Sequence, residues 1–195
     1  MYMSTTARSS AVLPAPAGAV WTVADLDQFP RGGRRYEVLH GELLVTPMPS
    51  VAHQRGVGEL FRQIANWCYE HVEWACFTPG GVYISETSWL EPDIAVFTVP
   101  ISPGLTWRNL PPPALVVEVL SPSTRRRDRY RKRPAYLAYG VGELWLLDQR
   151  ERSVERWTHA SEFPEIHRDG ITWTPVDTSP SLVLSSEMLF GMREV

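Results

Sequence analysis

The chain has 195 residues, of which 44% are hydrophobic and 21% are charged, and it carries a formal net charge of −3 with a pI of about 6.0. These values are typical of a globular protein with a sizeable core and exclude a chain that is disordered throughout. The slight acidity argues against a basic coat protein of nucleic acids, because phosphate binding draws its affinity from clustered Lys and Arg, but it leaves room for a local basic surface.

Cysteine usage and hydropathy indicate the compartment. Cys68 and Cys76 lack the spacing of a zinc site and are too few for a disulfide framework, so we expect free thiols in the reducing cytoplasm. No window holds the roughly 18 uninterrupted apolar residues of a membrane helix. Residues 1–19 are rich in Ser, Ala and Pro and lack a signal-peptide pattern, so we expect a flexible leader followed by a single domain over 20–195.

The N-terminal third predicts a short helix, a hairpin and a long helix. Thr22 is a typical helix cap, and a short helix would run from it toward Phe29. Strand-like runs at 36–39 and 42–46 flank His40-Gly41, which is a hairpin signal. Ser50 can cap the longest helical pattern of the chain, whose apolar face is expected to comprise Val57, Leu60, Phe61, Ile64, Ala65, Cys68 and Tyr69.

The remaining two thirds predict mostly strands. Short strands are expected at 76–78, 82–85 and 93–98, and a central strand at 114–120. A basic helix from Asp128 to about Tyr139 would end at Gly140, before a hairpin of strands 143–148 and 152–158 and a tail with short strands and a last turn near Met188. Helices that flank a mixed sheet give an α/β architecture.

The Pro-rich segment at 99–113 is long enough to be a functional or protruding loop. Trp107 lies within it and would either stack on a nucleobase or pin the loop to the protein. The residue pattern leaves both interpretations open.

Two acids interrupt otherwise apolar strands. Glu118 lies in the middle of the run 114–120, which is apolar on both faces, and Asp93 opens the run 93–97. An ionised carboxylate in such a strand is costly unless a cation neutralises it. The two acids therefore suggest a pair held together by a metal ion, and the alternative for Glu118 is a structural ion pair with an arginine.

A lysine completes the candidate site. Carboxylates on neighbouring strands can bind Mg²⁺, which polarises a phosphoryl oxygen and lowers the pKa of a bound water. Lys132 is the candidate ammonium that stabilises developing charge or orients that water. Asp128, Lys132, Tyr136 and Gly140 follow at steps of four, so one helical face would present acid, base and aromatic together. Asp128 would otherwise cap the helix, and His53 is either a neighbour of the site or a capping histidine.

Several strings of the chain together resemble the Uma-two family of restriction endonucleases. They run in the family's order over roughly residues 20 to 160, which makes them far more specific than any single motif. The strings are Arg35-Tyr36-Glu37-Val38-Leu39-His40-Gly41-Glu42-Leu43, Pro92-Asp93-Ile94, Val117-Glu118-Val119-Leu120-Ser121-Pro122-Ser123-Thr124, the spacing of Asp128, Lys132 and Tyr136 before Gly140-Val141, and Glu143-Leu144-Trp145-Leu146-Leu147-Asp148.

The resemblance implies a PD-(D/E)xK nuclease with a restriction-endonuclease-like fold, in which a mixed central sheet is flanked by helices and preceded by an N-terminal β-hairpin. It implies Mg²⁺-dependent hydrolysis of phosphodiester bonds in DNA, with Mn²⁺ as an alternative ion. Superfamily members often cut duplexes as two-fold dimers, so we expect a homodimer.

Carried over residue by residue, Asp93 is the "PD" acid and Glu118 the "(D/E)" acid. Leu120 stands where the usual lysine would be, and the family supplies the lysine from the following helix, at Lys132. Under the nuclease hypothesis, the main-chain carbonyl of Val119 would be a further metal ligand. The N-terminal hairpin also contributes an acid, for which we favour Glu42 over Glu37, although Glu42 would otherwise be an ordinary turn-flanking residue.

Two features of the basic segment bear on this assignment. Residues 125–133 hold seven basic residues in nine positions, and they form either a phosphate-contacting ridge or a solvated surface. Pro134 requires the helix to kink or to begin late, in which case Lys132 would lie on a loop. The predicted DNA-contacting residues are Arg125, Arg126, Arg127, Arg129, Arg131 and Arg133. The rival hypothesis is a non-catalytic module that binds nucleic acid or a partner and retains the nuclease fold.

Overall fold

A mixed six-stranded sheet forms the centre of the protein, in a computed structural model that describes residues 11–13, 19–30, 33–99, 102–175 and 180–191. Its order is β11-β10-β9-β8-β7-β4, and only the pair β8–β9 is parallel. The strands are β4 (Trp74–Phe77), β7 (Ile94–Thr98), β8 (Leu115–Val119), β9 (Glu143–Asp148), β10 (Ser153–Thr158) and β11 (Glu165–His167). The predicted α/β fold with a mixed central sheet is confirmed.

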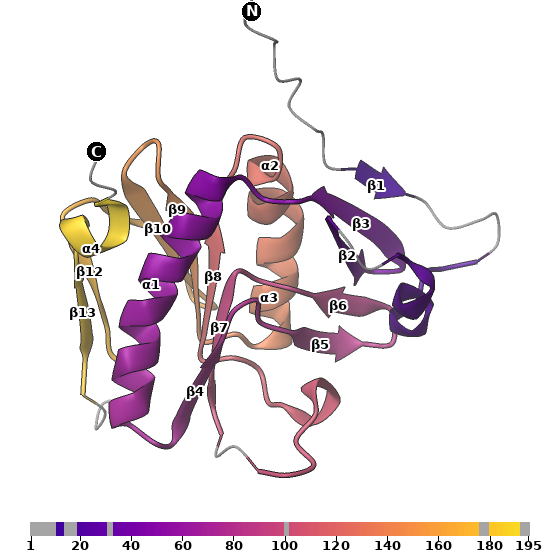
Figure 1. The fold of residues 1–195 in the computed structure, drawn as a ribbon, viewed down its shortest axis with the longest axis horizontal. Coiled ribbons are helices and arrows are strands. Elements are labelled where there is room, and N and C mark those ends of the chain that lie inside the picture. The colour runs from indigo at the N-terminus through magenta and orange to yellow at the C-terminus, as the bar shows by residue number, and fades with distance from the viewer. Residues whose placement is uncertain (1–10, 14–18, 31–32, 100–101, 176–179, 192–195) are drawn as a thin grey trace, which may run out of the picture.

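A five-stranded antiparallel sheet lies beside the central sheet (Figure 1). Its order is β1 (Ala11–Leu13), β3 (Glu42–Pro47), β2 (Arg34–Leu39), β6 (Ser88–Leu90) and β5 (Val82–Ser85). The predicted hairpin of β2 and β3 turns at His40 and Gly41, whose φ angles of 51° and 77° are those of a tight hairpin turn. A third sheet pairs β12 (Gly170–Trp173) with β13 (Leu182–Ser185).

Helices cover both faces of the central sheet. Helix α1 (Val51–Glu70) packs on one face, and Ser50 caps it by accepting a hydrogen bond from the His53 N–H at 3.2 Å. The other face carries α2 (Arg125–Arg127), a π-helical segment (Asp128–Lys132) and α3 (Arg133–Tyr139). The remaining helices are the 3₁₀ helices Val23–Gln28 and Trp107–Asn109 and the C-terminal α4 (Ser186–Phe190).

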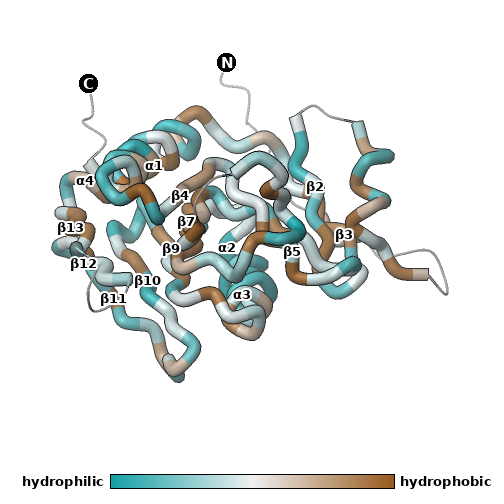
Figure 2. Tube along the Cα trace, turned by 90° about the horizontal axis from the view of Figure 1, so that it is seen from below, coloured by the Kyte–Doolittle hydropathy of each residue, from teal (hydrophilic) through white to brown (hydrophobic). Residues whose placement is uncertain are grey.

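Strand alternation decides which way Glu118 points. Leu115, Val117 and Val119 belong to the hydrophobic cluster under α1, whereas Val116 belongs to the cluster under α3. Successive side chains of a strand point to opposite faces, so Glu118 lies on the same face as Val116, toward α3. Hydrophobic residues gather along the central strands, as Figure 2 shows for β7 and β9. A carboxylate is thus placed inside a packed apolar layer.

The structure also corrects the sequence-based boundaries. The basic helix begins at Arg125 rather than Asp128, and β6 and β11 were not predicted because three-residue strands carry little periodicity. Trp67, not Tyr69, completes the buried face of α1: Trp67 is 7% exposed and Tyr69 88%. The predicted leader lies mostly outside the described residues, but Ala11–Leu13 pairs with β3. Within the described residues, no helix is long and apolar enough to span a membrane.

Candidate active site

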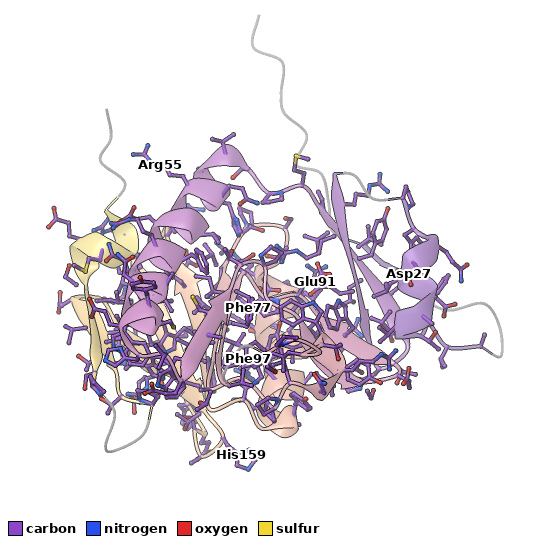
Figure 3. All side chains as sticks on the ribbon, turned by 60° about the horizontal axis from the view of Figure 1, so that its bottom comes forward. Asp27, Arg55, Phe77, Glu91, Phe97 and His159 are labelled. Atoms are coloured by element: carbon purple, nitrogen blue, oxygen red, sulfur yellow. The ribbon has the colours of Figure 1, made fainter. Side chains whose placement is uncertain are left out.

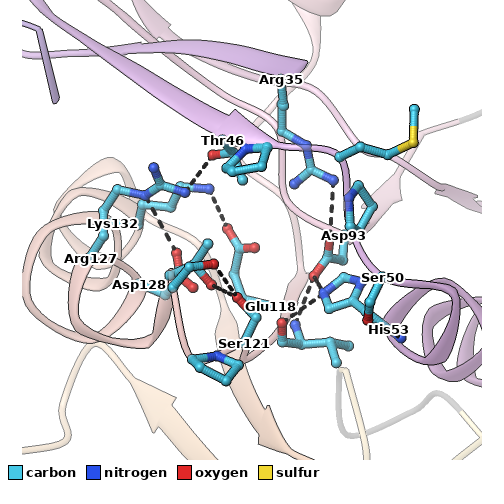
Figure 4. Close-up of a pocket in the computed structure, with 17 residues that line it drawn as sticks. Arg35, Thr46, Ser50, His53, Asp93, Glu118, Ser121, Arg127, Asp128 and Lys132 are labelled. Carbon is cyan, nitrogen blue, oxygen red and sulfur yellow. Dashed lines mark hydrogen bonds and ion pairs between the residues drawn. The ribbon is translucent and has the colours of Figure 1, made fainter. Parts of the chain in front are cut away.

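A cavity of about 370 Å³ opens where the ends of both main sheets meet the start of α1 and the basic helix (Figure 4). Asp93, Glu118, Val119 and Lys132 all line it, so the structure brings together four of the residues that the sequence singled out. The other lining residues are Arg35, Thr46, Pro47, Met48, Pro49, Ser50, His53, Ser121, Pro122, Ser123, Thr124, Arg127 and Asp128.

Asp93 is held as an anion. Its Oδ1 accepts a hydrogen bond from Arg35 Nη2 at 3.1 Å, and its Oδ2 accepts one from the Val119 N–H at 2.9 Å. His53 Nε2 lies 3.3 Å from the same Oδ2. Burial alone would raise the pKa of Asp93, but the His53 hydrogen bond and the Arg35 charge outweigh it and lower this pKa to about 2. Asp93 is therefore ionised at neutral pH.

Glu118 is less well neutralised. Its Oε1 accepts hydrogen bonds from Lys132 Nζ at 3.1 Å and from the Tyr136 hydroxyl at 2.8 Å. Burial raises the pKa of Glu118 to about 8, and the charges of Asp128 and Asp93 add to this effect although Lys132 opposes it. Within the described chain, its second oxygen, Oε2, accepts no hydrogen bond. The pocket therefore has one carboxylate that an additional cation would stabilise.

Lys132 bridges two acids from two sheets. Its Nζ lies 2.7 Å from Glu37 Oε1 and 3.1 Å from Glu118 Oε1, and the residue is 1% exposed. Burial lowers the pKa of Lys132, but the charges of Glu118 and Glu37 outweigh burial and raise this pKa above its usual value. The lysine is thus a fixed ammonium group that lies directly beside Glu118.

Glu37, rather than Glu42, is the hairpin acid that reaches the site. Neither acid lines the cavity itself, but Glu37 is fully buried against Lys132, which does, whereas the Glu42 side chain is 45% exposed and pairs with Arg131. The register pairs Glu37 with Leu44 and Leu39 with Glu42, so both acids lie on one face of the hairpin. They differ in distance from the turn, because Glu42 follows the turn directly and Glu37 lies deeper in the sheet.

Pro134 does not displace Lys132 onto a loop. The five residues Asp128–Lys132 are π-helical, and the α-helix resumes at Arg133. A π turn is wider than an α turn and interrupts the regular backbone ladder where Pro134 has no N–H to donate. Lys132 and Tyr136 therefore stay on one helical face, and both donate to Glu118 Oε1.

The predicted ridge of arginines is largely engaged within the protein itself. Arg129 binds Glu155 at 2.7 Å, Arg131 binds Glu42, and Arg133 stacks on Trp157 at 3.9 Å from the ring centre. Arg127 is buried, donates to Thr46 Oγ1 at 2.6 Å and lines the cavity, while Arg125 lies 3.9 Å from Asp148. Arg126 is exposed and has no ion pair in the described chain.

His53 and Asp128 are site residues whose placement the sequence left open. The Ser50 cap fixes the first turn of α1, and His53 Nε2 then lies 2.9 Å from the Val119 carbonyl oxygen. Burial lowers the pKa of His53, but Asp93 outweighs burial and raises it. Asp128 is 2% exposed and lines the cavity, and burial raises its pKa. A Ser cap three residues before a histidine was the available signal for His53.

The donor atoms suit a hydrated Mg²⁺ ion. Among the described residues, no group of three or more His, Cys, Asp and Glu side chains is arranged to hold a metal. Mg²⁺ is commonly bound by only one or two carboxylates, with water and phosphate oxygens completing its shell. Asp93 Oδ2 and the Val119 carbonyl converge on one point, because a single atom, His53 Nε2, lies within 3.3 Å of both. Asp93 and the Val119 carbonyl thus offer two oxygen donors around the position of His53 Nε2, and Glu118 lines the same cavity.

Comparisons with known proteins give the fold and the family of the chain. The fold is that of a nuclease-like protein: it matches a solved structure described as "a putative nuclease belonging to DUF820" from Anabaena variabilis, with a TM-score of 0.73 and 20% sequence identity over 88% of this chain and 98% of that chain. The chain belongs to the Uma2 family, described as "Putative restriction endonuclease", whose model matches residues 23–187. No curated protein matches significantly.

Proposed function

We propose that the protein is a Mg²⁺-dependent endonuclease that hydrolyses phosphodiester bonds in DNA, with Mn²⁺ as an alternative ion. One observation carries this proposal: Asp93 and Glu118, from neighbouring segments of one sheet, line one cavity in which the Lys132 ammonium lies 3.1 Å from Glu118. A surplus of acid supports it, because the four buried acids Glu37, Asp93, Glu118 and Asp128 face only three permanent cations, Arg35, Arg127 and Lys132.

The residues in and around the cavity would have separate roles. Asp93, Glu118 and the Val119 carbonyl would hold the ion, which when bound polarises the scissile phosphate and acidifies a water. Lys132 would stabilise negative charge that develops at the phosphate, while Glu37 and Tyr136 hold the Lys132–Glu118 pair in place. Arg127, which has two guanidinium nitrogens without a hydrogen bond, would contact a phosphate oxygen. A homodimer would allow both strands of a duplex to be cut.

A second candidate is a non-catalytic module that binds nucleic acid or a partner. One contact favours it: Arg35 binds Asp93 at 3.1 Å, and His53 Nε2 lies between Asp93 and the Val119 carbonyl, so protein cations already neutralise the first acid. Under this hypothesis Asp93 and Glu118 only hold the sheet together through ion pairs.

Metal calorimetry and plasmid nicking in the same buffers separate the two. We expect Mg²⁺ or Mn²⁺ binding and nicking in the wild type, and the loss of both in Asp93→Asn and Glu118→Gln. Glu143→Gln is the matched control, because Glu143 is a buried strand acid of the same sheet that pairs with Arg156 outside the cavity. Wild-type protein that binds neither ion at millimolar concentration would reject the nuclease and leave the binding module.

A further inference from the structure

A second, larger cavity adjoins the candidate active site. It has a volume of about 840 Å³ and lies between the five-stranded sheet, the 3₁₀ helix Val23–Gln28 and the loop that carries Trp107. Arg35 lines both cavities: its Nη2 donates to Asp93 and its Nη1 donates to the Glu91 carbonyl at 2.8 Å. A polymer whose phosphate lies at Asp93 would therefore have a neighbouring unit within reach of the second cavity.

The lining of this cavity is aromatic and basic. The aromatic residues are Phe29, Tyr36, Tyr83, Trp89 and Trp107. Three guanidinium groups also line it, those of Arg34, Arg35 and Arg108; Arg35 is paired with Asp93, and Arg108 binds Glu86 and lies over the Tyr83 ring. Flat apolar rings with guanidinium groups between them are the lining that stacks on nucleobases while attracting the backbone that carries them.

The indole groups are set in place by packing behind them. Trp107 meets Trp89 at 6.1 Å, and behind it lie Phe77 and Phe97, at 5.1 and 6.5 Å between ring centres. Phe77, on β4, and Phe97, on the neighbouring strand β7, are labelled in Figure 3. A side chain at Gly81 would lie 2.4 Å from Trp89 and 2.8 Å from Trp107, so only glycine lets the two indoles approach. Trp107 itself stays 37% exposed.

We infer that the second cavity binds an unpaired nucleobase of the DNA strand whose phosphate lies at Asp93, Glu118 and Lys132. A base inside a duplex is already stacked and cannot enter a cavity, so the substrate would be single-stranded, frayed or distorted DNA. This inference rests on the proposed nuclease function, since it takes the position of the phosphate from it. It also assigns Trp107 to base stacking, one of the two roles left open by the sequence.

The test uses the full-length protein with single-stranded oligothymidylate that carries 5-iodouracil, in EDTA, so that binding is measured without cleavage. Ultraviolet crosslinking followed by peptide mass spectrometry should place the crosslink on Trp89, Trp107, Tyr36 or Tyr83. Trp107→Leu should weaken binding about tenfold, the usual contribution of one stacked base. Tyr69→Leu, at an aromatic residue 88% exposed on α1, is the control and should bind like the wild type.

The outcomes separate the two proposals. Crosslinks confined to other peptides, or unchanged affinity in Trp107→Leu that is folded by circular dichroism, overturn the base site even if nicking persists. Should Trp107→Leu fail to fold, an abasic analogue scanned along the oligonucleotide replaces it, and equal affinity at every position overturns the inference. Crosslinks at the aromatic residues without metal binding or nicking reject only the nuclease. Wild-type protein that binds no oligonucleotide overturns the base site, and plasmid nicking then decides the nuclease separately.

Discussion

Asp93, just before β7, and Glu118, on the adjacent strand β8, line the same cavity, yet their surroundings shift their pKa values in opposite directions. Asp93 receives donors from three elements, Arg35 on β2, His53 on α1 and the main chain of β8, and its pKa falls to about 2. Glu118 shares its one cation with Glu37 and faces further acids, and burial raises its pKa to about 8.

The difference shows that burial alone does not set the charge of a carboxylate. Both residues are almost fully buried, at 4% and 3% exposed, so their desolvation is similar. The two carboxylates differ in the number of donors and cations that they do not share with another acid. Asp93 is a preformed anion, whereas Glu118 lacks part of its neutralisation. Four changes break or sharpen this contrast.

Removing the shared cation should have the largest effect. Lys132→Met leaves the ionised Glu37 buried without its ammonium and removes one donor to Glu118, and breaking a buried ion pair on one side typically costs about 3–5 kcal/mol. We expect a loss of that size in the free energy of unfolding, measured by urea denaturation at pH 7, together with the loss of nicking. Arg126→Met, an exposed cation of the same segment, should change stability by less than about 0.5 kcal/mol. A similar small change for Lys132→Met would show that the lysine neutralises neither acid.

The pH dependence of stability should separate the two acids. A pKa raised from 4.5 to about 8 means that the folded protein holds a proton on Glu118 which the unfolded chain has released, so stability falls as pH rises from 4.5 to 8. For Asp93 the shift is opposite, and its contribution is lost as pH falls from 3.8 toward 2.

Metal-free wild type should therefore lose on the order of 3 kcal/mol between pH 5 and 8, the free energy of this shift of the Glu118 pKa across that range. Glu118→Gln should flatten this slope, apart from a smaller contribution of the same sign from His53, whose pKa is also raised. Asp93→Asn should remove the loss on the acid side. An unchanged slope above pH 5 in Glu118→Gln would show that Glu118 is ionised throughout that range.

Adding the metal at alkaline pH should restore part of the folding stability that is lost when Glu118 ionises. Mg²⁺ at roughly ten times its dissociation constant contributes about 1.4 kcal/mol of stability. For a chain of this size that corresponds to a rise of about 3–5 °C in Tm. We expect this rise at pH 8 in the wild type, its reversal by EDTA, and none in Glu118→Gln. An equal rise in both proteins would place the ion elsewhere.

The sequence predicted those parts that depend on local pattern. The hairpin at His40-Gly41, the capped helix after Ser50 and the strands that bear Asp93 and Glu118 follow from turn chemistry and periodicity. The choice of Glu37 over Glu42 depends on depth in a sheet, and the place of His53 depends on how α1 docks, neither of which leaves a periodic signal. The aromatic cavity joins residues from 23 to 108, so only the folded chain reveals it.

Pro134→Ala should have the smallest effect on stability. This variant tests whether the proline or the ion pairs hold Lys132 beside Glu118. Alanine restores a backbone N–H, which would gain about 1 kcal/mol if the π turn tightened to an α turn. Tightening would move Lys132 away from Glu37 and Glu118, which lie 2.7 and 3.1 Å from its Nζ, and the loss of a buried pair is several times larger. The ion pairs should therefore keep the wide turn. Stability should change by less than about 1 kcal/mol, with the pH slope of Glu118 unchanged. An altered slope in Pro134→Ala would instead show that the proline, rather than the two carboxylates, positions the lysine.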